Sequence, residues 1–191
     1  MRMQKIQEAR ARAKELTRTL KGFIQQHPMA PSALRGTVSH IMTRGAATCG
    51  RWESLAVAAR VLWEVDCGVV PIVDGEQVLV GVLTDRDLCM ASYTQGRPLS
   101  EIPVEGVLSR EPVTIQESDS LDRAVELMMG HSIRRLIVVD GEQHCVGVLS
   151  LADLVRYCTS ESSSSAAREA LIELLAQLSR PRAAPEAESA S

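Results

Sequence analysis

The chain has 191 residues, of which 45% are apolar and 24% charged, which is enough for one ordinary domain or two small ones. Aromatic residues make up only 3% and the net charge is −3, so we expect neither a base-stacking platform nor a general attraction to nucleic acid. Five dispersed cysteines without CxxC spacing are typical of reduced, buried thiols and not of disulfides or a metal site. No stretch reaches the length of a membrane span and the N-terminus lacks the apolar core of a secretory signal, so the sequence predicts a cytoplasmic protein.

Residues 1–36 are predicted to form an N-terminal amphipathic helix and a linker. Basic residues flank its apolar stripe, which is compatible with a membrane surface, an acidic partner or a transit sequence, although Glu8 and Glu15 argue against the last. The simpler alternative is a helix that packs against its own domain or a sister subunit. The apolar stripe consists of Ile6, Ala9, Ala13, Leu16, Leu20 and Ile24.

An internal duplication fills the middle of the chain. Residues 38–88 return as residues 104–154 at a constant offset, and 17 of the 51 paired positions are identical. Chance would give about three identities at ordinary residue frequencies. The chain is therefore expected to divide into the N-terminal segment (1–36), repeat 1 (37–93), a linker (94–103), repeat 2 (104–158), and a final segment (159–191) with a Ser-rich linker, a short helix (166–178) and a disordered tail (180–191).

Each repeat shows the same order of predicted elements, β-α-β-β-α. A short extended piece precedes a helix with an apolar stripe, and two runs rich in β-branched residues then flank an Asp-Gly turn, which indicates a hairpin. A second helix opens at Thr84 in one copy and at Ser150 in the other. The hairpin strands are apolar on both faces and one copy alone is marginal, so we expect an α/β (α+β) fold with the two repeats packed around a pseudo-twofold axis. The expected segments before the second helices are 46–49, 53–65, 69–73 and 78–83 in repeat 1, and 112–115, 119–131, 135–139 and 145–149 in repeat 2.

The start of the second helix carries a hydroxyl and, three residues later, a carboxylate in both copies: Thr84 with Asp87, and Ser150 with Asp153. Free N–H groups and the helix dipole suit such a helix start to a phosphate, and the carboxylate can accept hydrogen bonds from the two hydroxyls of a ribose. The alternative is a capping box, in which the two side chains satisfy the helix end itself. Both polar positions persist while the residues between them differ, which favours the nucleotide hypothesis.

The repeated strings resemble the CBS domain, a module that binds adenine nucleotides as a tandem pair in many regulators. The resemblance covers about residues 37–157 and is carried by "GVLTDRDL" and "GVLSLADL", by "VPIVDG" and "LIVVDG", and by "IMTR" and "VLSR". The chain is similar in style to stand-alone bacterial CBS pairs. It departs from the family pattern at Ile137, where Pro is usual, and in the degenerate opening "RGAATCG" of repeat 1.

In this family each ligand cleft is built across the two repeats, which implies two sites here. Site 1 gathers up to three arginines and is the better candidate for a phosphorylated ligand, because a guanidinium group fits phosphate. Site 2 receives no cation from its expected segments, so adenosine, a weakly charged ligand or no ligand is expected there. Site 1 is expected to comprise Thr84, Arg86, Asp87, Thr114, Ile133, Arg134, Arg135 and Leu136, and site 2 to comprise Ser150, Asp153, Thr48, Cys67, Gly68, Val69 and Val70.

The sequence contains no GxSxG, HExxH or Walker-type motif, so we expect no catalysis, no metal and no catalytic cofactor. The resemblance implies a regulatory sensor whose effector is an adenosine-containing ligand: AMP, ADP, ATP or S-adenosylmethionine. It also implies a homodimer that signals to an effector protein of unknown identity. The alternative function is a dimerisation or assembly scaffold whose clefts are vestigial.

Overall fold

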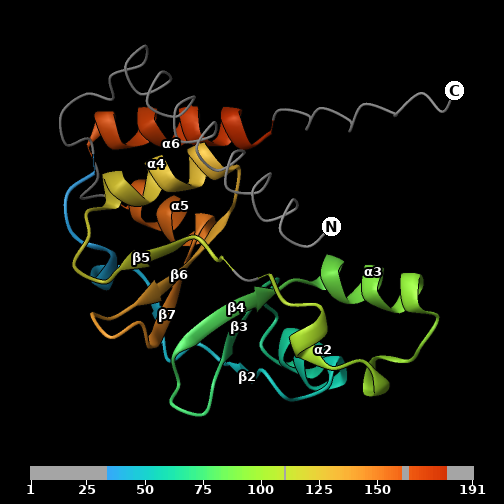
Figure 1. Cartoon of the computed structure of the whole chain (residues 1–191). Coiled ribbons are helices and arrows are strands. Elements are labelled where there is room, and N and C mark those ends of the chain that lie inside the picture. The colour runs from blue at the N-terminus through green and yellow to red at the C-terminus, as the bar shows by residue number, and fades with distance from the viewer. Residues whose placement is uncertain (1–33, 110, 161–163, 180–191) are drawn as a thin grey trace, which may run out of the picture.

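The computed structural model describes residues 34–109, 111–160 and 164–179. The predicted N-terminal helix and the predicted disordered tail lie outside these residues. Within them, two small sheets lie at the centre, and the helices of each repeat pack on its own sheet (Figure 1). No described helix is long and apolar enough to cross a membrane.

Repeat 1 contains a three-stranded sheet in the order β2-β3-β4. The first two strands are parallel, and the second and third form the expected antiparallel hairpin. Helices α2 and α3 bury their apolar sides in the core of this repeat. Its elements are β2 (Cys49–Gly50), α2 (Leu55–Glu64), β3 (Val70–Val73), β4 (Leu79–Leu83), α3 (Asp85–Gln95) and the 3₁₀ helix η2 (Leu99–Glu101).

Repeat 2 has the same order of elements, which confirms the predicted mixed α and β fold with a duplicated unit. Strand β5 runs parallel to β6, and β6 pairs antiparallel with β7. The first strand of each repeat begins two or three residues later than the sequence pattern indicates. The elements of repeat 2 are β5 (Thr114–Gln116), α4 (Leu121–His131), β6 (Arg135–Val139), β7 (Cys145–Ser150) and α5 (Leu151–Thr159).

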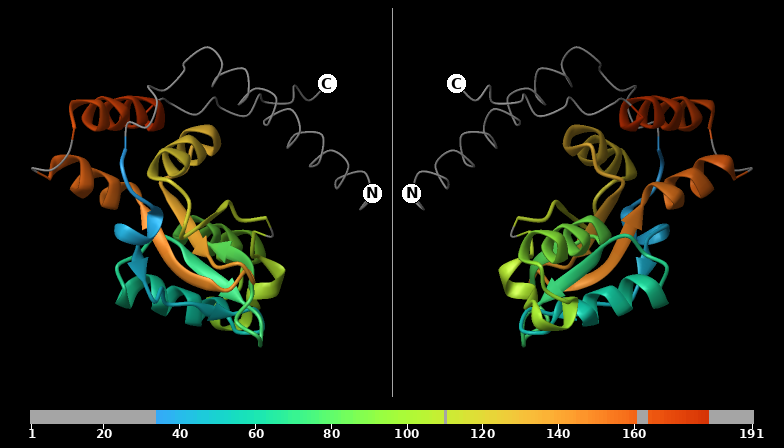
Figure 2. Two further views of the ribbon diagram at one scale, coloured as in Figure 1. Left: turned by 90° about the vertical axis from the view of Figure 1, so that its left-hand side faces the viewer. Right: turned by 90° about the vertical axis from the view of Figure 1, so that its right-hand side faces the viewer.

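A further helix, α6 (Ser165–Leu178), matches the short helix expected at 166–178 and lies beside α4 and α5 in every view (Figures 1 and 2). Its first turn is capped by Ser164, whose hydroxyl accepts a hydrogen bond from the N–H of Ala167 at 3.1 Å. Its inner face contributes Ala170 and Leu174 to the core of repeat 2. Because it shares that core, α6 is an integral part of repeat 2.

The opening segment of each repeat packs into the other repeat. Strand β1 (Thr43–Arg44) pairs with β7, so the sheet of repeat 2 has the order β1-β7-β6-β5, and Ser109 bridges to Val82 of β4 in the equivalent way. The 3₁₀ helix η1 (Val38–His40) packs in the core of repeat 2, and η3 (Val104–Gly106) packs in that of repeat 1. The sequence predicts two repeats that pack around a pseudo-twofold axis, and the structure shows in addition that their opening segments are exchanged.

Two glycines permit the exchange. A Cβ atom on Gly147 would lie 2.5 Å from the carbonyl oxygen of Thr43, and a Cβ atom on Gly81 would lie 2.6 Å from that of Ser109. Because each neighbour is a backbone atom of the crossing segment, a side chain could not displace it without moving that segment. This close approach explains why "VGVL" occurs in both copies.

The identical "DGEQ" strings form the two hairpin turns. The carboxylates of Asp74 and Asp140 each accept hydrogen bonds from two backbone N–H groups further along the turn, and the Gln of each string adopts a left-handed φ of 66° or 67°. The backbone N–H of His144 is the main reason that the pKa of the Asp140 carboxyl lies below its usual range. Val78 bridges to His144, its repeat-related counterpart, where the hairpins meet. Paired contacts between equivalent positions are what a pseudo-twofold axis requires.

Candidate ligand-binding site

Two cavities lie between the repeats, with volumes of about 870 Å³ (cavity 1) and about 760 Å³ (cavity 2). Repeat-related residues line them at matching places, so that Thr84 in cavity 1 corresponds to Ser150 in cavity 2, and Ile133 corresponds to Cys67. Each cavity has walls from both repeats. Three residues line both cavities: Val69, Arg134 and Arg135.

The hydroxyl and carboxylate of the repeated motif form a capping box in both copies. At the start of α3, Thr84 Oγ1 accepts from the backbone N–H of Asp87 (3.3 Å), and Asp87 Oδ2 accepts from the backbone N–H (2.8 Å) and the hydroxyl (2.7 Å) of Thr84. At the start of α5, Ser150 and Asp153 make the same three hydrogen bonds at 3.2, 2.7 and 2.5 Å. The alternative considered for this motif is therefore present in the structure.

The second oxygen of the capping carboxylate differs between the two copies in whether it already accepts a hydrogen bond. Among the described residues, Asp87 Oδ1 has no hydrogen-bond partner, whereas Asp153 Oδ1 accepts from the guanidinium of Arg156. Asp153 is only 4% exposed and lines cavity 2, while Asp87 is half-buried and lies outside the lining of cavity 1. A capping box occupies one carboxylate oxygen and fixes the orientation of the other. Capping and ligand binding are therefore compatible roles for these residues.

Arg134 and Arg135 place positive charge where the two cavities meet. The guanidinium of Arg135 lies against repeat 1, because a Cβ atom on Gly68 would be 2.8 Å from its Nη1 atom. Repeat 1 has Gly68 and Val69 at the equivalent positions, so both cations come from repeat 2. Arg156 adds a further cation to the lining of cavity 2. The segments expected at site 2 bring no cation themselves, but Arg135 of β6 and Arg134 just before it reach both cavities.

The alternation of side chains along a strand decides which expected residues reach the cavities. In β6, Arg135 and Ile137 line cavity 1, whereas Leu136 between them is fully buried in the core of repeat 2. In the same way Val70 is fully buried in the core of repeat 1. The residues expected at site 1 that line cavity 1 are Thr84, Ile133, Arg134 and Arg135, and those expected at site 2 that line cavity 2 are Ser150, Asp153, Cys67 and Val69.

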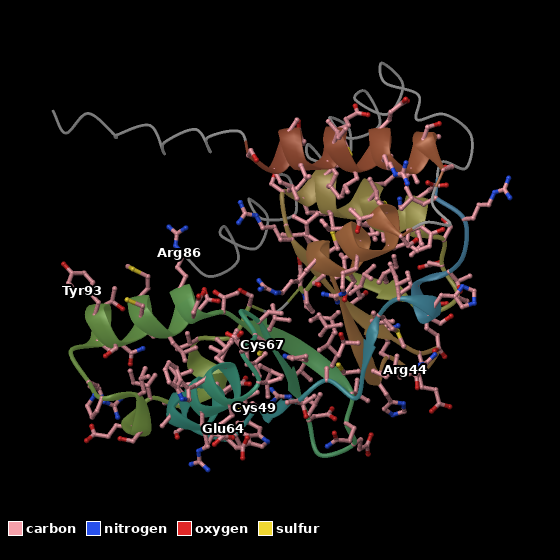
Figure 3. All side chains as sticks on the ribbon, turned by 180° about the vertical axis from the view of Figure 1, so that it is seen from behind. Arg44, Cys49, Glu64, Cys67, Arg86 and Tyr93 are labelled. Atoms are coloured by element: carbon pink, nitrogen blue, oxygen red, sulfur yellow. The ribbon has the colours of Figure 1, made fainter. Side chains whose placement is uncertain are left out.

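The other expected site residues lie elsewhere. Arg86 is exposed and projects from α3 (Figure 3). Gly68 lines cavity 1 and not cavity 2. Thr48 and Thr114 are half-buried, and neither lines a cavity. Thr114 lies in β5 opposite Ile137, one residue beyond the cavity wall at Val113.

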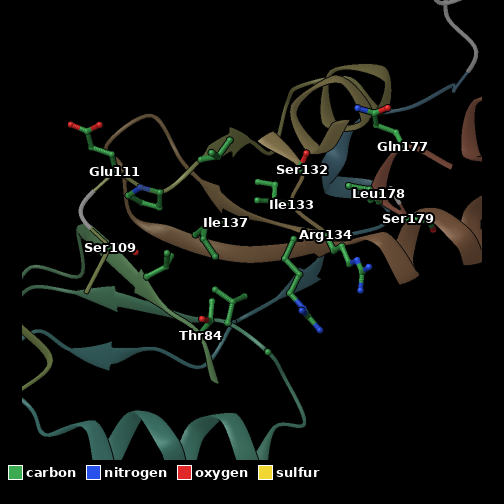
Figure 4. Close-up of a pocket in the computed structure, with 16 residues that line it drawn as sticks. Thr84, Ser109, Glu111, Ser132, Ile133, Arg134, Ile137, Gln177, Leu178 and Ser179 are labelled. Carbon is green, nitrogen blue, oxygen red and sulfur yellow. The ribbon is translucent and has the colours of Figure 1, made fainter. Parts of the chain in front are cut away.

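Several lining residues were not expected from the sequence. Side chains alternate between the two faces of a strand, so Ile137 lies on the same face as Arg135 and could have been predicted to line a cavity. The same argument applies to Pro71, which follows Val69 in repeat 1. Thr43 and Ser109 reach the cavities only through the exchange of opening segments. The end of α6 also lines cavity 1, and no sequence signal connects it with the repeats (Figure 4). Its lining residues are Gln177, Leu178 and Ser179.

Three of the five cysteine thiols have a raised pKa. Burial, together with a hydrogen bond to Glu53, raises the pKa of the Cys49 thiol to about 12, and burial also raises the pKa of Cys145 and Cys158. All five thiols are free. In the described part of the chain, no group of three His, Cys, Asp or Glu side chains could hold a metal ion.

The fold and the paired cavities define a tandem-repeat protein with two clefts built between its halves. The family model for the CBS domain matches residues 38–93 and 104–160, which is more than half of the chain. The chain therefore belongs to the CBS domain family, and the resemblance seen in the repeated strings is confirmed. It is similar to the CBS domain-containing protein YhcV of Bacillus subtilis, with 37% identity over 131 residues, 68% of this chain and 91% of that protein.

Solved structures of CBS pairs superpose on the chain. CBSX2 in complex with AMP matches with a TM-score of 0.57 and 26% identity, covering 64% of this chain and 95% of that one. The CBS domain pair of protein MJ0100 in complex with 5′-methylthioadenosine and S-adenosyl-L-methionine matches with a TM-score of 0.56 and 25% identity, covering 63% of this chain and 94% of that one. Both similar proteins hold ligands that contain adenosine.

Proposed function

We propose that this chain is a regulatory module without catalytic activity, which binds a phosphorylated adenosine ligand in the cavities between its repeats. The observation that carries the proposal is the pair of matched cavities, each with a capped helix start (Thr84 or Ser150) and both lined by Arg134 and Arg135. The adenosine ligands of similar CBS pairs support this ligand class. AMP is the first candidate and ADP and ATP are the phosphorylated alternatives, while S-adenosylmethionine is an alternative adenosine ligand without phosphate.

The chemistry of the walls assigns a role to each part of such a ligand. The guanidinium groups of Arg134 and Arg135 would bind the phosphate, with charge-assisted hydrogen bonds worth roughly 1.5–3 kcal/mol each. In cavity 2, Asp153 would accept hydrogen bonds from the ribose hydroxyls. In cavity 1, Val113 and Ile133 supply apolar surface for the base.

Regulation would follow from the position of the cavities between two bodies. A ligand that contacts both repeats stabilises the arrangement that it binds by RT ln(1 + [L]/Kd), which is roughly 2.7 kcal/mol at a hundredfold excess over Kd. A partner protein responds only if it distinguishes this arrangement from the ligand-free one. The chain would then act as a sensor that reports adenosine-ligand concentration through its shape.

A second candidate function is assembly, with the clefts vestigial. Its support is the exposure of aromatic side chains on repeat 1, where Trp63 of α2 is 85% exposed and Tyr93 of α3 is 82% exposed. On repeat 2, α6 covers the corresponding helices. A homodimer through repeat 1 would bury these side chains. Light scattering tests it, because a Trp63→Ser, Tyr93→Ser double variant should be monomeric where the unchanged chain is dimeric.

Isothermal titration calorimetry with AMP, ADP, ATP and S-adenosylmethionine separates the two functions. A sensor binds at least one of them, and Arg135→Ala weakens binding of the phosphorylated ligand about tenfold or more. Arg123→Ala is the matched control, because Arg123 pairs with Glu126 and lines neither cavity. Absence of heat for all four ligands, or equal affinities of both variants, would refute the proposal.

A further inference from the structure

Helix α6 gives cavity 1 a wall that cavity 2 lacks. It lies after the second CBS segment, which ends at residue 160, yet its last turn and the next residue line cavity 1. No described residue outside the two CBS segments lines cavity 2. Figure 4 shows Gln177 and Leu178 at one end of the cavity and Thr84 at the other, with Ile133 and Ile137 between them. The pseudo-symmetry of the two cavities is therefore broken at the end remote from Thr84.

Gln177 presents an unpaired polar group at this end. Its Oε1 atom is buried and has no hydrogen-bond partner among the described residues. A buried acceptor without a donor is destabilising, so such atoms in folded proteins normally have a partner. Gln177 lines a cavity of about 870 Å³, which has room for a ligand to supply the missing donor.

The remainder of α6 is firmly attached to repeat 2. Leu171 and Leu174 are buried in its core, and Leu178 packs against the same core. The helix therefore holds Gln177 in place on the side of the cavity formed by Ile133, and a contact between ligand and Gln177 would connect the ligand directly to α6. The outer side of α6 exposes Ile172 and Leu175, which are 65% and 38% exposed.

We infer that the last turn of α6 is a ligand-binding wall of cavity 1, and that Gln177 hydrogen-bonds the base of the adenosine ligand. This inference rests on the proposed function, which places the phosphate at the arginines and the base against Val113 and Ile133. The amide of Gln177 accepts from an amino group or donates to a ring nitrogen, both of which adenine offers. Cavity 1 thereby gains a base contact from α6 that has no counterpart among the described residues lining cavity 2, and its occupancy holds the end of α6 against repeat 2.

The Gln177→Leu variant tests the inference by titration with AMP. Leucine keeps a similar size and removes both hydrogen-bonding atoms, so one of the two AMP sites should weaken about three- to tenfold. The other site should keep its affinity and serve as an internal reference. Gln95→Leu is the matched control, since Gln95 is the exposed last residue of α3 and lines neither cavity. It should bind AMP as the unchanged chain does.

Hydrogen exchange supplies the second measurement. In the unchanged chain, AMP should slow amide exchange in the last turn of α6, and in Gln177→Leu this protection should be lost. AMP affinities within twofold of the unchanged chain at both sites, or exchange in α6 that is indifferent to AMP, would overturn the inference. If the unchanged chain binds none of the adenosine ligands, the proposed function itself fails. If the unchanged chain binds AMP and Gln177→Leu binds it equally well, only the assignment of α6 as a ligand-binding wall fails.

Discussion

Replacement of Gly147 by alanine tests the exchange of segments that forms the cleft. The added Cβ would lie 2.5 Å from the carbonyl oxygen of Thr43, in the two-residue strand β1. Normal contact between these atoms needs roughly 3.4 Å, so β1 must move away from β7 by nearly 1 Å. That movement disturbs the ladder that ties β1 to the sheet of repeat 2, in which Thr43 and Arg44 pair with Val148 and Gly147 itself.

The expected cost follows from these changes. Overpacking against a rigid neighbour costs about 1–3 kcal/mol, and weakening a ladder hydrogen bond costs about 1 kcal/mol more. The lower backbone entropy of alanine in the unfolded chain offsets about 0.4–1 kcal/mol. The net loss is about 2 kcal/mol, which for a chain of this size lowers Tm by roughly 4–8 °C.

Thermal and urea unfolding measure this loss. Gly141→Ala is the control, because a Cβ atom there meets nothing within 4 Å and its φ is not left-handed. The control should keep the stability of the unchanged chain to within about 1 kcal/mol. Gly81→Ala, whose Cβ would meet the side chain of Leu108 as well as the carbonyl oxygen of Ser109, should be destabilised at least as much as Gly147→Ala. If Gly147→Ala is as stable as Gly141→Ala, β1 does not cross β7 at this point and the exchange is refuted.

Two further predictions concern stability. Thr84→Ala and Ser150→Ala should each lower the free energy of unfolding by about 1 kcal/mol in urea denaturation, because each removes a helix cap. Ser54→Ala is the control, since Ser54 occupies the N-cap of α2 without a side-chain cap bond, and an equal loss there would contradict the capping assignment. The Cys49 thiol, with its pKa raised from 9.0 to about 12, keeps its proton in the folded chain where the unfolded chain has lost it. The free energy of unfolding should therefore fall as pH rises from 9.0 towards 12, less steeply in Cys49→Ser, and identical pH profiles of the two proteins would contradict this.

Periodicity and the duplication were sufficient to predict the order of elements. The Asp-Gly turns marked both hairpins, and a hydroxyl before an acidic first turn marked the starts of α3 and α5 at Thr84 and Ser150. The exchange could not be predicted in this way. The segment that opens each repeat has the same apolar pattern whether it packs on its own repeat or on the other one. Its only trace in the sequence is the pair of glycines in "VGVL", which the pattern does not distinguish from ordinary strand glycines.

The lining of the cavities was predicted in part, and the differences have a common physical source. The resemblance indicated contiguous segments, while only alternate residues of a strand face a cavity, so Leu136 and Val70 were included and Ile137 was left out. The reach of Arg135 across to Gly68 depends on how the two bodies meet. The contribution of α6 depends on tertiary packing of a helix outside the repeats, which no local pattern indicates.

Native mass spectrometry of the chain with AMP tests the central claim most directly, because it counts ligands per chain. Two matched cavities predict up to two AMP molecules on the unchanged chain. Ala47→Trp, which fills the wall of cavity 2 and leaves the lining of cavity 1 untouched, should bind at most one. No bound AMP at saturating concentration, or the same count of two for Ala47→Trp, would contradict the claim that the cavities between the repeats are the ligand sites.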